Sequence, residues 1–129
     1  MTAEDNRKLV QMCYEAFDRG DLQVIYDAVS DDVVWTNHSP ETWAYSGVYY
    51  GQGGVEQYFL NLDVIKLERF DVRRILAEDD TVVVVLDQRY TVKATGKSAE
   101  GPLVHLLTLK DGKIATFDEL EHCENSAWA

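Results

Sequence analysis

The chain has 129 residues, of which 46% are hydrophobic and 27% charged, and this composition fits one folded domain spanning residues 1–129. Its formal net charge of −11 argues against nucleic acids and anionic membranes as partners, because their phosphates repel an acidic protein. The longest apolar run, Val82 to Leu86, is far too short for a membrane helix. Since the first residues are polar and show no secretory leader, we expect a cytoplasmic protein.

The N-terminal part of the chain predicts two helices. Apolar residues recur at helical spacing from about Ala3 to Arg19, with Thr2 placed to cap the first turn and Gly20 to end the last. A second, short helix is expected after Asp21, and the polar residues 30–32 interrupt it.

The middle of the chain mixes strand, loop and helix. The β-rich segment Val33–His38 predicts a strand. Residues 39–50 predict a long loop, and apolar spacing from Val55 to Leu62 predicts a third helix.

The second half of the chain consists of β-rich runs separated by short polar turns. These runs are Leu67–Glu78, Thr81–Lys93, Ser98–Lys110 and Lys113–Cys123. Asp111-Gly112 is a strong signal for a two-residue hairpin, and turns this short force antiparallel neighbours. Three helices followed by such a meander predict an α+β fold, in which a curved, mostly antiparallel sheet encloses the helices.

The cysteines and histidines do not form a metal-binding pattern. Cys13 and Cys123 lie far apart, and we expect both to be reduced thiols. His38, His105 and His122 lack metal-ligand spacing, and no glycine-rich nucleotide-binding motif is present. The sequence therefore predicts neither a metal nor another cofactor.

Four segments of the chain form a family pattern: Tyr14–Leu22, Ser30–Trp35, Tyr50–Val55 and Asp111–Ile114. Together they resemble the SnoaL-like and ketosteroid-isomerase-like branch of the nuclear transport factor 2-like superfamily. The resemblance implies a cone-shaped α+β barrel with an internal pocket. It does not fix an activity, because this fold hosts isomerases, dehydratases, hydrolases, cyclases and proteins without chemistry.

The resemblance also assigns the steroid-isomerase groups to positions in this chain. The tyrosine of the first helix falls on Cys13, one residue before Tyr14, and a one-residue shift that restores Tyr14 displaces the apolar face of the helix. The general-base aspartate falls on Asn37 and the second carboxylic acid on Val104. An amide cannot accept a proton at neutral pH and valine donates no hydrogen bond, so these residues argue against steroid isomerisation by that mechanism.

The pattern of SnoaL-type cyclases points instead to a carboxylate at Glu119, with Phe117 and Asp118 in place of a histidine and a tryptophan. Strand alternation puts Phe117, Glu119 and Glu121 on one face, which the resemblance turns toward the pocket. A carboxylate walled by Trp35 and Phe117 is suited to moving protons. The alternative is that Glu119 is half exposed at the pocket mouth or takes part in an ion pair.

The sequence does not decide which face of the run Thr81–Lys93 points inward, because the stretch Val82–Leu86 is apolar on both faces. Asp87 and Arg89 share one face, and Gln88 and Tyr90 share the other. If Arg89 points inward, it can pair with Glu119 or bind an anionic group. Otherwise it belongs to a solvated face of the sheet.

The end of the first strand and the following loop supply further candidates. Asn37 is expected to bind a ligand or a neighbouring carboxylate, whereas His38 is either an acid–base group at the pocket rim or a partner of the loop backbone. Trp43 and Tyr45 lie in the long loop, which we expect to form a lid or rim of an aromatic pocket. His105 is expected on the outer sheet face, where the fold is commonly dimeric.

Two functions are compatible with these features. The first is a cofactor-free enzyme for a small, largely apolar molecule, with Glu119 as acid or base, Asn37 as polarising donor, and Arg89 or His38 as orienting group. The second is a ligand-binding or dimerisation module without chemistry. In both cases the expected partners are a small apolar molecule and a second copy of the chain.

Overall fold

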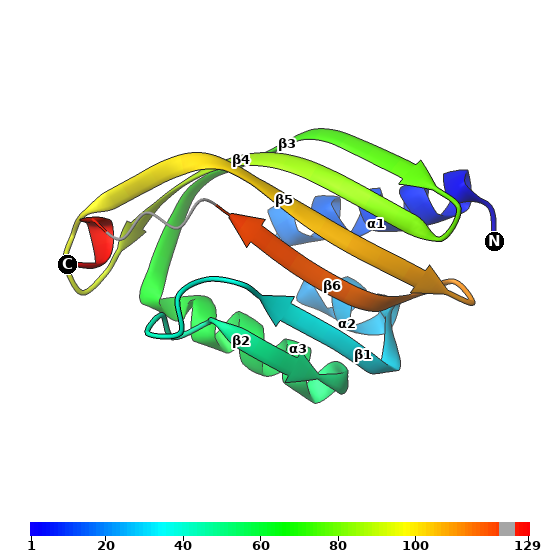
Figure 1. Ribbon diagram of the computed structural model, residues 1–129, viewed down its shortest axis with the longest axis horizontal. Coiled ribbons are helices and arrows are strands. Elements are labelled where there is room, and N and C mark those ends of the chain that lie inside the picture. The colour runs from blue at the N-terminus through cyan, green and yellow to red at the C-terminus, as the bar shows by residue number, and fades with distance from the viewer. Residues whose placement is uncertain (122–125) are drawn as a thin grey trace.

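A computed structural model describes residues 1–121 and 126–129. Within these residues, three α-helices and six strands form the fold (Figure 1). The helices are α1 (Ala3–Asp18), α2 (Leu22–Ala28) and α3 (Gly51–Asn61), and the strands are β1 (Val29–Asn37), β2 (Gly47–Tyr50), β3 (Ile65–Glu78), β4 (Thr81–Val92), β5 (Ser98–Lys110) and β6 (Lys113–Glu121). Short 3-10 turns, η1 (Leu62–Val64) and η2 (Ser126–Trp128), complete it. No described helix has the length and apolarity needed to cross a membrane.

The first helix begins and ends at the predicted residues. The backbone N–H of Asp5 donates to Oγ1 of Thr2 (3.1 Å), and the N–H of Thr2 donates to the Asp5 carboxylate (3.0 Å). This reciprocal capping box satisfies two donors that the first turn leaves open. Gly20 follows with a φ of 76°, a left-handed conformation that glycine adopts without strain and that ends the helix.

The strands form one curved, open sheet in the order β2-β1-β6-β5-β4-β3. All neighbouring strands are antiparallel except β1 and β6, which run parallel. The helices lie on the concave side of this sheet, and β2 and β3 form its edges (Figure 1). The predicted α+β cone with a mostly antiparallel sheet is therefore confirmed, as an open cone and not a closed barrel.

The turn between β5 and β6 matches its sequence signal. Asp111 and Gly112 have φ values of 52° and 77°, so both residues adopt the left-handed conformation that a type I′ hairpin needs. The predicted antiparallel pairing follows, with Lys110 opposite Lys113.

Two boundaries differ from the prediction. Strand β1 begins at Val29, directly after α2, so the polar residues 30–32 lie within a strand and do not separate two elements. Residues Gly47–Tyr50, predicted as loop, form the edge strand β2 against β1. An edge strand of this length pairs on one side only and carries little periodicity in its sequence. His122 and Cys123, predicted to end the last strand, lie outside the described residues.

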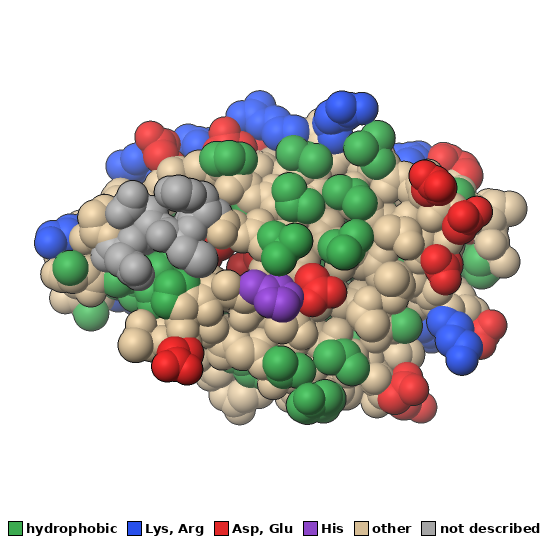
Figure 2. Space-filling view, viewed as in Figure 1, with side chains coloured by type: hydrophobic (Ala, Val, Ile, Leu, Met, Phe, Trp, Pro, Cys, Tyr) green, Lys and Arg blue, Asp and Glu red, His purple; other side chains and the backbone are tan. Residues whose placement is uncertain are grey.

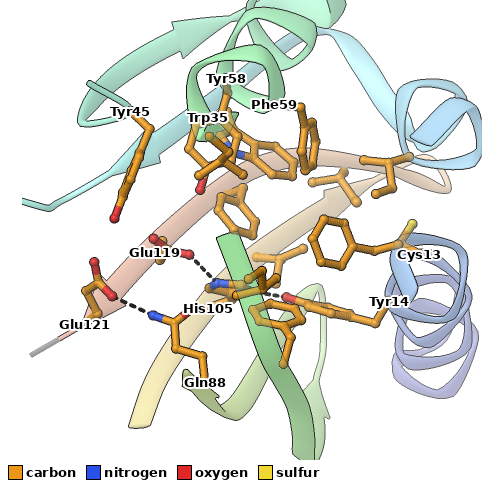
Figure 3. Close-up of a pocket in the computed structure, with 18 of the residues that line it drawn as sticks. Cys13, Tyr14, Trp35, Tyr45, Tyr58, Phe59, Gln88, His105, Glu119 and Glu121 are labelled. Carbon is orange, nitrogen blue, oxygen red and sulfur yellow. Dashed lines mark hydrogen bonds and ion pairs between the residues drawn. The ribbon is translucent and has the colours of Figure 1, made fainter. Parts of the chain in front are cut away.

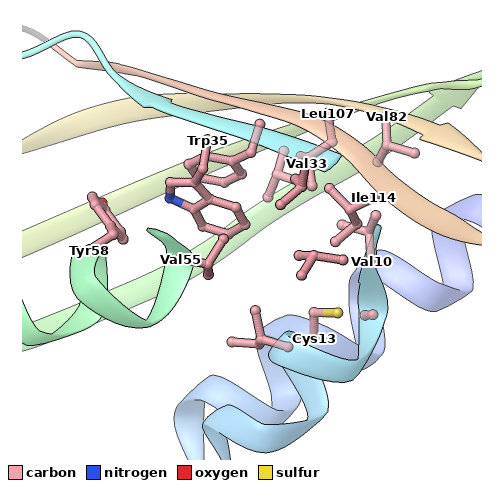
Figure 4. Close-up of a cluster of buried hydrophobic side chains, with 14 of the residues drawn as sticks. Val10, Cys13, Val33, Trp35, Val55, Tyr58, Val82, Leu107 and Ile114 are labelled. Carbon is pink, nitrogen blue, oxygen red and sulfur yellow. The ribbon is translucent and has the colours of Figure 1, made fainter. Parts of the chain in front are cut away.

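The core lies between the helices and the concave face of the sheet (Figure 4). Val82, Val84 and Leu86 point inward along β4 and have no exposed surface, and Val10 of α1 and Val55 of α3 are equally buried. Each such side chain contributes about 1.5–3 kcal/mol through burial. The core therefore fixes which residues of each strand face the interior.

Within the described residues no helix covers the convex face of the sheet, and part of this face is apolar. Val83 and Val85 of β4 and Val104 and Leu106 of β5 are half-buried there, and Leu120 of β6 is 45% exposed. Figure 2 shows hydrophobic side chains gathered over this face. Apolar patches of this kind favour association between proteins.

We expect a homodimer formed through this convex face. Sedimentation at micromolar protein should give twice the monomer mass, and Leu106→Glu should reduce it to the monomer because a charge then replaces apolar contact. Leu60→Glu is the matched control, since Leu60 is 68% exposed on α3, away from this face. A monomeric wild-type protein would contradict the prediction.

Candidate functional site

The helices and the concave sheet face line a partly open cavity of about 80 Å³ (Figure 3). Most of its lining is aromatic or aliphatic, with side chains from all three helices and from β1 and β3 to β6. The polar and ionisable side chains of its lining are Tyr14, Tyr45, Tyr58, Gln88, Tyr90, His105, Glu119 and Glu121. An apolar cavity with a few polar groups is the usual form of a small-molecule site.

Strand pairing brings the central polar groups side by side. The parallel register of β1 and β6 sets Asn37 beside Glu119, and the antiparallel register of β5 and β6 sets His105 on the other side of Glu119. The neighbouring inward pair is Trp35 and Phe117, whose rings stack 3.8 Å apart. A polar row across three strands thus adjoins an aromatic row.

Glu119 is the central ionisable group of the polar row. Its residue is 9% exposed, and Nε2 of His105 donates to its Oε1 over 2.8 Å. Nδ2 of Asn37 donates to Oε2, while Oδ1 of Asn37 accepts from the backbone N–H of Ser39 (3.0 Å), which fixes the orientation of the amide. Both carboxylate oxygens therefore receive a donor, as a buried carboxylate requires.

The polar row continues from His105 to the first helix. The hydroxyl of Tyr14 is hydrogen-bonded to Nδ1 of His105 (Figure 3). Because Nε2–H points at Glu119, Nδ1 of a neutral ring accepts the proton of Tyr14. Burial raises the pKa of Tyr14 well above its ordinary value, with a further contribution from the charge of Glu119. A continuous hydrogen-bonded path therefore runs from Tyr14 through His105 and Glu119 to Asn37.

A second carboxylate lies on the same face of β6. Oγ of Ser39 donates to Oε1 of Glu121 (2.9 Å), and Nε2 of Gln88 donates to Oε2 (2.8 Å). Burial raises the pKa of Glu121 to about 7, and the nearby charge of Glu119 adds to the effect. Glu121 thus changes its charge close to neutral pH.

Comparisons with known proteins agree with this architecture. A family model described as "SnoaL-like domain" matches residues 10–117. The chain belongs to the SnoaL-like domain family. A search of curated proteins found no match.

Solved structures show the same fold. An NTF2-like protein of unknown function from Burkholderia pseudomallei K96243 is 25% identical, with a TM-score of 0.81 over 95% of this chain and 92% of that chain. An NTF2-like protein from Burkholderia xenovorans LB400 is 20% identical, with a TM-score of 0.82 over 98% and 95%. TerC, co-crystallised with polyporic acid, is 23% identical, with a TM-score of 0.79 over 92% of each chain.

Several predicted site residues line the cavity of this SnoaL-like domain, and others do not. Trp35, Tyr45, Phe117 and Glu119 line it, and Asn37 lies directly behind Glu119 and is 1% exposed. Trp43 is buried but is not among the lining residues, because its ring stacks on Trp128 at 4.6 Å.

Of the two alternatives for Arg89, the structure shows the solvated sheet face and not the pairing with Glu119, so Arg89 does not belong to the predicted ligand site. Arg89 lies on the convex face with its side chain 40% exposed, 3.7 Å from Glu68 and 3.6 Å from Glu100. Gln88 and Tyr90 of the same strand face the cavity instead. Because the residues before them, Val82 to Leu86, are apolar on both faces of the strand, the sequence alone could not decide which face points inward.

Two histidines, His38 and His105, lie in other places than the sequence predicts. The ring of His38 is 46% exposed and binds Asp118 at 2.8 Å, away from the cavity lining, so it does not reach the Glu119 carboxylate, although the His38 backbone N–H donates to the Glu119 carbonyl (3.2 Å). His105 was expected on the outer face, but it is 4% exposed inside the cavity. Counting back from the hairpin places Val104 opposite Glu119, but a bulge between Thr108 and Leu109 shifts the pairing by one residue.

Tyr14 is a further site residue that the sequence left aside. Both Cys13 and Tyr14 line the cavity, and it is Tyr14 that carries a hydroxyl to His105. Cys13 packs in the apolar core as predicted, and its pKa is raised to about 11 by burial. A hydroxyl from the first helix therefore reaches the site without displacing the helix's apolar face.

We predict that Glu121 makes the stability of this SnoaL-like domain depend on pH. Its folded pKa of about 7 exceeds the ordinary 4.5, so between these values the folded state holds a proton that the unfolded chain releases. The free energy of unfolding should therefore fall by about 3 kcal/mol as the pH rises through this window. Glu121→Gln removes this titration.

Urea unfolding of both proteins at mildly acidic and mildly alkaline pH provides the measurement. The wild-type protein should lose stability relative to Glu121→Gln as the pH rises. Parallel pH dependences in the two proteins would show that burial of Glu121 does not perturb its titration.

Proposed function

We propose that this SnoaL-like domain is a cofactor-free acid–base enzyme that moves a proton on a small, largely apolar molecule. The observation that supports this is the buried Glu119 carboxylate on the wall of an apolar cavity, held by His105 and Asn37. A positioned carboxylate that is shielded from water is an effective group for proton transfer.

Each member of the polar row has a separate task in this proposal. Glu119 accepts a proton from the bound molecule and later returns it. His105 and Asn37 hold the two carboxylate oxygens in place, and Tyr14 fixes the ring of His105 through Nδ1. Proton removal followed by return at another atom is an isomerisation, and it requires no co-reactant.

The cavity restricts the size and polarity of the molecule. A volume of about 80 Å³ suits a small molecule. Phe17, Phe59 and Leu62 belong to the apolar part of the lining and are only partly buried. A molecule with a hydrocarbon body and one polar group fits this lining.

Proton exchange in heavy water provides a test that needs no knowledge of the natural substrate. A panel of small cyclic ketones is incubated in D₂O, and NMR follows loss of the protons next to the carbonyl; ring opening is followed for small epoxides. We expect the wild-type protein to accelerate exchange for members of the panel. Glu119→Gln should lower this rate by about 10²- to 10⁴-fold, the usual contribution of a general base.

Arg89→Gln is the control variant, because Arg89 lies on the convex face and should not affect the rate. Glu119→Gln should also cost about 1–3 kcal/mol of stability, because its new amide group then faces the amide of Asn37. Rates are therefore compared well below the unfolding temperature of each variant. Ligand binding by the wild-type protein without any proton exchange would overturn the proposal and favour a non-catalytic binding module.

A further inference from the structure

The cavity of this domain combines aromatic walls with two carboxylates. Nine of the described residues that line it are phenylalanine, tyrosine or tryptophan, so rings form much of its surface. Glu119 and Glu121 also line it, whereas the described lining residues include no lysine and no arginine. Negative charge and aromatic rings together are the features with which proteins bind organic cations.

Three tyrosines from different parts of the fold surround the two carboxylates. Tyr45 precedes β2, Tyr58 belongs to α3 and Tyr90 to β4. Burial raises the pKa of all three, and the charges of both Glu119 and Glu121 add to the rise. Figure 3 shows Tyr45 at the same end of the cavity as the two carboxylates. The negative potential of the carboxylates therefore acts where the rings gather.

Glu121 has no task in the proposed proton transfer. Ser39 and Gln88 donate to its two oxygens over 2.9 and 2.8 Å, and both of these donors are neutral. They fix the position of the carboxylate without adding a positive charge. A cation beside Glu121 favours the ionised form of this carboxyl group, whose pKa burial raises to about 7.

A buried donor in the same cavity has no acceptor within the described residues. Trp35 is 4% exposed, and its Nε1 is buried without a hydrogen-bond partner among residues 1–121 and 126–129. The indole is fixed by its stack on Phe117 at 3.8 Å. Nearly all buried polar groups in native proteins have a partner. A bound molecule that carries one oxygen can supply the missing acceptor.

We propose that the cavity binds a small methylated ammonium ion that carries one oxygen. The positive charge lies between the carboxylates of Glu119 and Glu121 and the tyrosine rings, and the oxygen accepts from Trp35. Rings attract a cation through the negative potential of their faces, and the carboxylates add direct charge attraction. The inference goes beyond the proposed function, because it holds whether or not Glu119 moves a proton.

The methyl groups of such an ion suit the rest of the lining. A fully methylated nitrogen has no N–H group, so it needs no hydrogen-bond acceptor when it leaves water. Its methyl groups can contact the apolar residues that form the remaining wall. An anionic ligand is disfavoured, because it meets the charges of Glu119 and Glu121 in the same cavity.

Chole-type probes of equal shape test the charge directly. Choline and 3,3-dimethylbutan-1-ol are nearly identical in shape and both carry a hydroxyl group, but only choline is charged. NMR titration of their methyl signals at mildly alkaline pH, where Glu121 is ionised, gives both affinities. The wild-type protein should bind choline about tenfold more tightly. Glu121→Gln should remove most of this preference and leave the affinity for the alcohol unchanged.

Two substitutions at Tyr45 test the aromatic part of the site. Tyr45→Leu should weaken choline binding, whereas Tyr45→Phe should retain it, because the ring and not the hydroxyl attracts the cation. Glu68→Gln is the matched control for Glu121→Gln, since it changes the net charge equally. Glu68 lies 3.7 Å from Arg89 on the convex face and is not among the lining residues, so this variant should bind choline like the wild-type protein.

Tetramethylammonium, which has no oxygen, tests the part of Trp35. The wild-type protein should bind choline about threefold more tightly than tetramethylammonium, because only choline offers an acceptor to Nε1. Trp35→Phe should remove this advantage. An advantage that persists in Trp35→Phe would overturn the assignment of the oxygen to Trp35.

The outcomes separate this inference from the proposed function. Choline has no carbonyl group, so its binding is measured without proton exchange. A preference for choline in a protein that exchanges no protons would support the cation site and overturn the enzyme. Equal affinity for choline and 3,3-dimethylbutan-1-ol, or a preference unchanged in both Glu121→Gln and Tyr45→Leu, would overturn the cation site alone. Failure of all three probes to bind would also overturn it.

Discussion

Burial of one carboxylate is the constraint on which the arrangement of the site depends. Glu119 points into an apolar interior, where an ionised group without donors is strongly unfavourable. Each oxygen has one donor, and the two donors come from strands on opposite sides of β6. Removing either neighbouring strand would leave the charge without half of its compensation.

The parallel pairing of β1 with β6 connects this constraint to the aromatic part of the cavity. The register that puts Asn37 beside Glu119 also puts Trp35 beside Phe117. The polar row is thus covered at one end by stacked rings, which limit the access of water. Low access of water strengthens every hydrogen bond in the row.

Much of the fold could be predicted from the sequence because its signals are local. Thr2, Gly20 and Asp111-Gly112 act within a few residues of themselves, and the long β-rich runs allow few alternatives. Glu119 and Glu121 could be placed on one face by alternation alone. Strand β2 was not predicted, because four residues with the sequence Gly-Val-Tyr-Tyr show no alternation of polar and apolar side chains.

The remaining site residues depend on information that is not local. His105 faces the cavity together with Leu103 and Leu107 on one face of β5, and an extra β6 residue between Ile114 and Thr116 brings Glu119 opposite His105, a shift that the sequence does not signal. The valines before Arg89 are apolar on both faces of β4, so the sequence does not decide which face points inward. Packing against the helices decides it, and Arg89 then faces outward. Tyr14 reaches His105 across 91 positions of sequence, a contact that exists only once the sheet has curved over α1.

The position of β6 has a consequence for how the chain folds. It is the last of the six described strands in chain order, yet it lies between β1 and β5. Until it is inserted, the β1–β2 pair and the β3–β4–β5 meander present open strand edges to each other and to other molecules, which makes this stage vulnerable to aggregation. Because the same strand carries Glu119, the polar row can form only when β6 joins the two parts of the sheet.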